Sequence, residues 1–151
     1  MHISWNFLDK RKAAIKAIEA FNSMKYILDH TDEEISAVRV KMEGTGSPGL
    51  TGMPKAQNPK AAEDRILACI EEIDILKERY RQAVEYMAWF DPAWSQLSED
   101  EQFVLETFYM DGDEPGANRV IQEELNISQS GAYNKKNRAL EHLTLLLYGK
   151  A

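Results

Sequence analysis

The residues best suited to binding chemistry lie close together near the end of the chain. The stretch from Ile127 to Leu140 holds three basic residues, Lys135, Lys136 and Arg138, and no acidic residue. Arginine and asparagine side chains can pair with guanine and adenine in the DNA major groove, while lysine and serine suit phosphate groups. With helical spacing, the polar side chains of this stretch gather on one side. The candidate DNA contacts are Ser128, Gln129, Ser130, Tyr133, Asn134, Lys135, Asn137 and Arg138.

A solvated polar face on an ordinary helical domain is the alternative interpretation of this stretch. The formal net charge of −7 counts against non-specific nucleic-acid binding, which depends on lysine and arginine. The stretch from Ile127 to Leu140 is therefore a small basic segment within an acidic chain.

The remaining chemistry-bearing side chains form no recognisable catalytic or metal-binding pattern. The histidines His2, His30 and His142 are scattered and lack the spacing of metal ligands. Cys69 is the only cysteine, so no internal disulfide can form, and its heptad position predicts a core residue. No Ser/His/Asp or Cys/His grouping stands out. We therefore expect no enzyme, no metal site and no cofactor.

The candidate face belongs to a predicted C-terminal domain, residues 97–149. Ser98 and Glu101 form the pattern of a capping box, which predicts the start of a helix. The apolar residues of this helix are expected to point inward. A polar turn over residues 110–116 then separates it from a short helix.

A tight turn is predicted between the short helix and the last one. Asn126 can adopt the left-handed conformation that ends a helix, Ile127 is expected to enter the core, and Ser128 can cap the next helix. The last helix should run to about Tyr148. A short helix, a tight turn and a capped longer helix are typical of a helix-turn-helix.

Upstream, apolar residues recur with the heptad spacing of a coiled coil. Before residue 43, the a and d positions are Phe7, Lys10, Ala14, Ala17, Phe21, Met24, Leu28, Thr31, Ile35, Val38 and Met42. After residue 59, they are Ile66, Cys69, Ile73, Leu76, Tyr80, Ala83, Met87 and Phe90. The segment 43–59 between them has four glycines and three prolines, which predicts a flexible connection.

These patterns predict a long antiparallel, coiled-coil-like helical hairpin over residues 1–91. Thr31 could begin a new helix, but the unchanged heptad register favours one long first helix with room for a kink. Pro92 predicts that the second helix ends at Asp91. The aromatic residues around this point predict a packed cluster between two domains rather than a binding cage.

The apolar stripe on the hairpin is wider than the a and d positions alone. It is flanked by Ile15, Ile18, Tyr26, Ile27, Ile70 and Val84. Because two helices would leave part of this surface exposed to water, we expect a homo-oligomer in which a second copy covers it. The hairpin would then serve oligomerisation or docking.

The composition is that of an ordinary globular protein, with 44% hydrophobic and 28% charged residues. No run of apolar residues is long enough to span a membrane, so no membrane association is expected. The first residues lack the basic and apolar regions of a signal peptide, and we expect a cytoplasmic protein.

Three segments of the C-terminal domain resemble region 4 of the sigma-70 family. They are residues 97–105 (Leu-Ser-Glu-Asp-Glu-Gln-Phe-Val-Leu), 123–128 (Glu-Glu-Leu-Asn-Ile-Ser) and 138–143 (Arg-Ala-Leu-Glu-His-Leu). Over residues 8–147, the chain resembles small sigma-region-4-like regulators encoded by phages and prophages of Gram-positive bacteria. In these proteins a helical hairpin, often with a loop like Met53-Pro54-Lys55, precedes the helix-turn-helix.

The resemblance implies recognition of a promoter element, contact with RNA polymerase and activation of late genes. Two features depart from the pattern. Gln122 stands where many helix-turn-helix proteins have alanine, and the acidic loop at 111–116 is longer than usual. Two other functions remain open: a phage small terminase subunit, and a helical adaptor that binds only protein.

Overall fold

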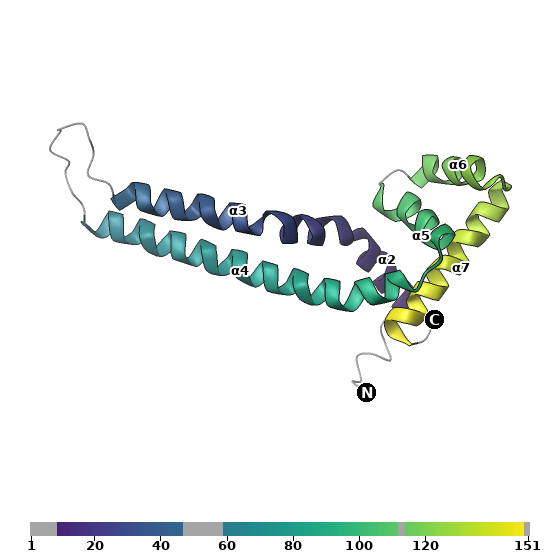
Figure 1. Ribbon diagram of the computed structural model, residues 1–151, viewed down its shortest axis with the longest axis horizontal. Coiled ribbons are helices and arrows are strands. Elements are labelled where there is room, and N and C mark those ends of the chain that lie inside the picture. Colours follow the sequence, from purple (N-terminus) through teal and green to yellow (C-terminus); the bar gives the residue numbers. More distant parts are fainter. Residues whose placement is uncertain (1–8, 47–58, 112–113, 150–151) are drawn as a thin grey trace. The chain divides into compact units, whose positions relative to one another are not determined.

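The computed structural model describes residues 9–46, 59–111 and 114–149, and this part of the chain is almost entirely helical and contains no strand (Figure 1). The expectation of an all-α protein is confirmed. The elements are α2 (Lys10–Glu19), α3 (Phe21–Gly46), α4 (Pro59–Ser95), α5 (Glu99–Leu105), the π-helical turn η1 (Glu106–Met110), α6 (Glu114–Leu125) and α7 (Gln129–Tyr148).

The chain divides into two compact units, and the boundaries between them fall inside α3 and α4. Residues 25–85 form one unit, which we call the hairpin unit; the described residues of 1–24 and 86–151 form the other, which we call the terminal unit. This division differs from the expected one at residues 1–91 and 97–149. The reason is that α2 packs against α7.

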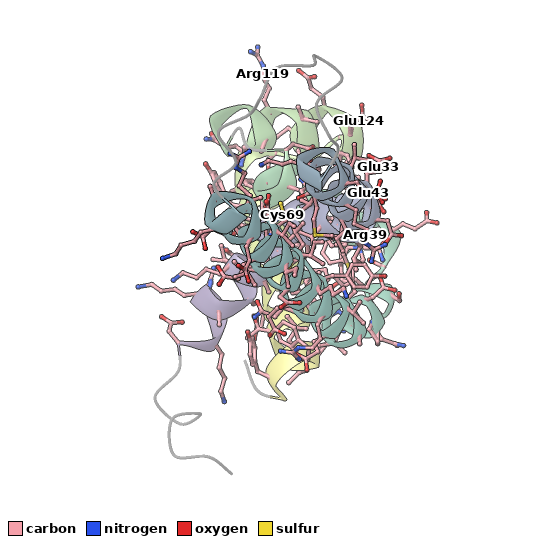
Figure 2. All side chains as sticks on the ribbon, turned by 90° about the vertical axis from the view of Figure 1, so that its left-hand side faces the viewer. Glu33, Arg39, Glu43, Cys69, Arg119 and Glu124 are labelled. Atoms are coloured by element: carbon pink, nitrogen blue, oxygen red, sulfur yellow. The ribbon has the colours of Figure 1, made fainter. Side chains whose placement is uncertain are left out.

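The hairpin unit consists of the antiparallel stretches of α3 and α4, which lie side by side (Figure 1). Its core joins Val38 of α3 to Cys69, Ile73 and Leu76 of α4, and all four are buried at heptad positions. Figure 2 shows Cys69 on the side of α4 that faces α3, so this thiol is a core residue, as expected.

The first helical segment is interrupted at the single residue Ala20, which fits the long first helix with room for a kink that the sequence favours. Residue Ala20 separates α2 from α3, although its N–H still donates to the Lys16 carbonyl (3.0 Å). The helix does not restart at Thr31, because the buried Thr31 hydroxyl donates to the Ile27 carbonyl within a continuous α3.

The ends of the helices near residues 43–59 and near Pro92 also differ from those expected. Residues 43–46 continue α3 and α4 begins at Pro59, while residues 47–58 of the predicted connection lie outside the described residues. The second helix does not end at Asp91 but passes through Pro92 to Ser95.

Packing explains why the proline does not end α4. Pro92 cannot donate to the carbonyl of Ala88, but both residues are exposed, so water can bond that carbonyl. Ala93 and Trp94, which follow Pro92, are buried in the main core of the terminal unit. Burial of these side chains stabilises the last turn against the local preference of the residue before proline.

The terminal unit has two apolar clusters. The larger one joins α2, the start of α3, the end of α4, α5 and α7 around the fully buried side chains of Ile18, Phe90 and Leu140. The smaller one joins α5, η1, α6 and α7 around Val104 and Ile121. Together these clusters pack α7 against α2, the end of α4, α5 and α6, so its remaining exposed side has a fixed orientation within the unit.

Candidate nucleic-acid interface

The turn between α6 and α7 has the local chemistry that the sequence predicts. Asn126 is left-handed (φ 54°), and the Ile127 N–H donates to the Gln122 carbonyl (3.2 Å). The Ser128 hydroxyl accepts from the Gly131 N–H (3.1 Å) and caps α7. Ile127 is half-buried against the smaller apolar cluster. The predicted end of α6 at Asn126, the packing of Ile127 against the core and the cap at Ser128 are therefore confirmed.

The start of α5 is capped as expected. Ser98 and Glu101 form a reciprocal capping box, with bonds of 3.2 Å to the Glu101 N–H and 3.0 Å to the Ser98 N–H. The other Glu101 oxygen accepts from Nδ1 of His142 on α7 (2.7 Å). Partial burial acts to raise the pKa of the Glu101 carboxyl, but the bonds from Ser98 and His142 outweigh it and hold that pKa below its usual value. This carboxylate thus ties α5 to α7.

The predicted DNA contacts are mostly exposed along α7. Ser130, Asn134, Asn137 and Arg138 are exposed, as are Ser128, Gln129 and Tyr133 around the first turns. Asn134 and Arg138 are four residues apart, so they lie on the same face of the helix. Neither side chain makes a hydrogen bond or ion pair with another described residue, which leaves both side chains free to bind a ligand.

Lys135 differs from the others, because it has an acidic neighbour. Its Nζ lies 3.5 Å from Oδ2 of Asp100 in the first turn of α5. Lys135, Asp100 and Arg138 line an open surface groove of about 280 Å³. The carboxylate partly neutralises the lysine that was expected to bind phosphate.

Lys136 and Tyr133 form a second local arrangement on α7. The Lys136 ammonium lies 5.0 Å from the centre of the Phe108 ring and 5.2 Å from that of Tyr133. Such a position over aromatic rings favours the cation and lets the stem of the side chain cover apolar surface. The Tyr133 ring therefore lies against Lys136 on the surface of α7, with 41% of the residue's surface exposed.

One contact that sequence reasoning missed joins α2 to this face. Nη2 of Arg11 donates to Oδ1 of Asn137 over 2.7 Å. The run Lys10-Arg11-Lys12 is the signal that could have drawn attention to α2, but a contact between residues 126 positions apart is not visible in local patterns.

The structure explains how Gln122 is accommodated where an alanine is more usual. Gln122 is half-buried and donates from its side-chain amide to Oδ1 of the buried Asn118, one turn earlier on α6. The two amides thus form a pair within α6, while Nδ2 of Asn118 is buried without a hydrogen-bond partner. The acidic turn is shorter than expected, because α6 already begins at Glu114; residues 112–113 lie outside the described residues.

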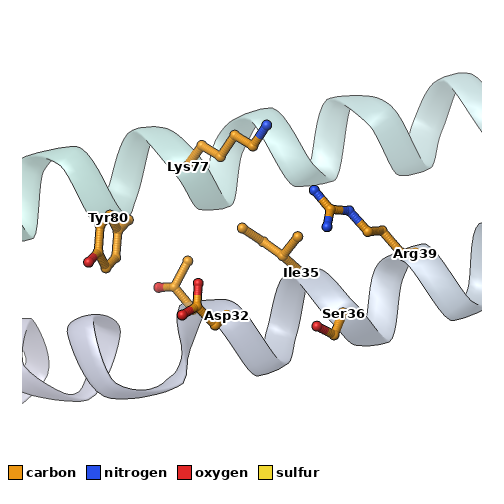
Figure 3. A pocket seen from close by; sticks show the side chains of 7 residues that line it. Asp32, Ile35, Ser36, Arg39, Lys77 and Tyr80 are labelled. Atoms are coloured by element: carbon orange, nitrogen blue, oxygen red, sulfur yellow. The ribbon is translucent and has the colours of Figure 1, made fainter.

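The hairpin unit carries a separate open groove of about 380 Å³ (Figure 3). Arg39 of α3 and Lys77 of α4 border it, together with Asp32 and Tyr80. These side chains are all exposed, so the groove is a surface hollow between two helices rather than an enclosed site.

The described residues hold no group of three or more histidine, cysteine, aspartate or glutamate side chains arranged to bind a metal ion. Among the same residues, no helix combines the length and apolar character needed to cross a membrane. Comparisons of the chain with models of protein families, with curated proteins and with solved structures gave no match.

Proposed function

We propose that this chain is a cytoplasmic, sequence-specific regulator that binds double-stranded promoter DNA through α7. The observation that carries the proposal is the exposed pair Asn134 and Arg138 on the helix after the capped turn. Both side chains can read base edges in the major groove, and neither has a partner among the described residues. The helix that bears them is fixed by apolar packing on its opposite side.

Contact with RNA polymerase belongs to the same proposal. It rests on the resemblance of residues 97–143 to region 4 of the sigma-70 family, whose members recognise promoters as part of the polymerase. The acidic surroundings of α7 support it, because a domain with few free cations gains little affinity from phosphates alone. Affinity would then come from a second half-site or from the polymerase.

The direct test is a selection of bound fragments from bacterial and phage DNA with the full chain. The selected fragments are then used in mobility-shift titrations at low salt, with and without RNA polymerase. We expect a shift in at least one of the two settings. Absence of any shift in both would reject the proposal.

The ion pair between Asp100 and Lys135 leads to a mutational prediction. In Asp100→Asn, Lys135 loses its carboxylate neighbour, and a negative charge is removed beside the interface. We expect DNA affinity to rise several-fold at low salt, with the gain shrinking as salt screens the charges. Fluorescence anisotropy titrations at several salt concentrations measure this effect.

The matched control for Asp100→Asn is Glu124→Gln. Glu124 is an exposed acidic residue of α6 (Figure 2), and the substitution removes the same charge from the same unit without touching α7. An equal gain in both variants would mean that only the overall charge matters, and the assigned place of Lys135 would be wrong.

A homo-oligomer is also part of the proposal, although fewer residues of the wide apolar stripe support it than the sequence suggests. Ile18 is fully buried and Ile15 half-buried in the terminal unit's own core, so a second copy is not needed to cover them. Ile70 and Val84 of α4 remain 44% and 45% exposed. They are 14 residues apart, at the same heptad position, and so lie on the same flank of the helix.

We expect light scattering at micromolar concentration to show at least a dimer, and Ile70→Asp to lower the mass because a charge is costly to bury. Ile75→Asp is the control, since Ile75 is 61% exposed and occupies a different heptad position. A monomeric wild type would refute the expected assembly, as would equal effects of the two substitutions.

A protein-binding adaptor is the second candidate, and one observation favours it. The elements α5, η1 and α6 together carry seven acidic residues and one basic residue. An acidic surface of this kind repels DNA and suits a basic protein partner. The DNA selection described above separates the two candidates.

A further inference from the structure

Charge in the terminal unit is segregated by helix. In contrast to the acidic elements α5, η1 and α6, the helices α2 and α7 together carry seven basic and two acidic residues. The two basic helices contact each other. The positive charge available beside the proposed recognition helix is therefore larger than α7 alone provides.

The position of Arg11 is set by its own helix. Asp9 caps α2 by accepting from the Lys12 N–H (3.1 Å), so Arg11 lies in the first turn. One and two turns later, Ala14 and Ile18 are fully buried in the cluster that contains Leu140 of α7. This packing anchors α2 to α7 and holds the guanidinium near the exposed face.

The hydrogen bond from Arg11 determines which atoms Asn137 can offer to a ligand. A guanidinium only donates hydrogen bonds, so the amide oxygen of Asn137 must be the atom that faces Arg11. The two N–H groups of the amide are then left to donate. Asn137 is thus prepared to donate to an acceptor on a ligand.

We propose that α2 is part of the DNA interface, with Arg11 positioning Asn137 to donate to a base acceptor and adding positive charge beside the DNA backbone. Suitable acceptors at the major-groove edge are N7 and O6 of guanine, N7 of adenine and O4 of thymine. This inference rests on the proposed DNA binding through α7. It extends the interface to a segment more than 100 residues away in sequence.

The test compares Arg11→Ala with the wild type on selected duplexes that carry each base at every position. We expect an affinity loss on the order of tenfold, a relaxed preference at one position, and a salt slope reduced by about one. Arg11→Lys should keep the salt slope but lose the preference, because lysine lacks the planar fork of arginine.

Two further variants separate positioning from general charge. Lys16→Ala removes an exposed charge from α2 and should leave the base preference unchanged. If Arg11 acts through Asn137, the losses in Arg11→Ala and Asn137→Ala should not add in the double variant. Thermal unfolding should be unchanged in all of them, since these side chains are exposed.

The role of α2 in DNA binding can be rejected separately from that of α7. Equal behaviour of Arg11→Ala and Lys16→Ala, in a protein whose binding still depends on Arg138, would overturn the role of α2 alone. If the wild type binds no DNA with or without RNA polymerase, both proposals fall.

Discussion

Phe90→Ala should lower the free energy of unfolding of the terminal unit by about 3–5 kcal/mol, the usual cost of removing a large buried aromatic side chain. Phe90 has no exposed surface. Its ring stacks on Tyr86 (5.2 Å between centroids) and Trp94 (5.5 Å), and it contacts Phe21 at 5.8 Å. Deleting it would leave a cavity at the point where α2, α3, α4 and α7 share one core.

Denaturant titration followed by circular dichroism and tryptophan fluorescence measures this loss. Trp89→Ala is the matched control, because Trp89 is the adjacent aromatic residue but is 40% exposed, and its main ring contact is with Tyr148. It should cost much less, and Trp94 still reports the unfolding of the unit. Phe90→Leu, which keeps an apolar side chain, should fall between the two. A loss in Phe90→Ala no larger than that in Trp89→Ala would contradict the described core.

Local chemistry made several parts of the fold predictable. Caps and turns depend on residues a few positions apart, so Ser98, Asn126 and Ser128 could be assigned from the sequence alone. The heptad pattern likewise identified the buried positions of the hairpin unit, because burial in a helix pair follows the period of the helix. Of these positions, Tyr80 is an exception, with 40% of its surface exposed.

Non-local packing accounts for the parts that were not predictable. The heptad register continues through Ala20, yet the helix is interrupted there, and Ala14, Ala17 and Ile18 before it share a core with α4 and α7. Pro92 shows the same effect, since burial of the residues after it outweighs its local preference. Neither the break nor the continued helix could be read from spacing within one segment.

The candidate site likewise combines features that local spacing predicts with contacts that only the fold brings together. The helical period places Asn134 and Arg138 on one exposed face without any knowledge of the fold. The neighbours of that face come from elsewhere: Asp100 lies 35 residues before Lys135, and Arg11 lies 126 residues before Asn137. These neighbours decide which cations are free and which amide atoms are available, so they alter the expected chemistry of each residue.

Arg138→Ala should weaken binding to the preferred DNA by about 1–3 kcal/mol, the usual value of a bidentate contact to guanine, and relax the preference at one base position. The reason is that Arg138 is exposed on α7 and has no carboxylate partner among the described residues, so its guanidinium can face the groove. Lys135→Ala should weaken all sequences alike and reduce the salt slope by at most about one, because Asp100 already neutralises part of that charge.

Arg138→Lys separates shape from charge, because it keeps the cation and removes the fork that can bond two acceptors of one guanine. It should therefore keep the salt slope of the wild type while losing most of the base preference. Arg79→Ala, which removes an exposed arginine from the hairpin unit, should leave both quantities unchanged. Anisotropy titrations against a panel of single-base variants measure affinity and preference together. If Arg138→Ala and Arg79→Ala gave the same affinity and the same preference, α7 would not be the helix that reads the DNA, and the acidic surface of α5 and α6 would become the better place to look for a partner.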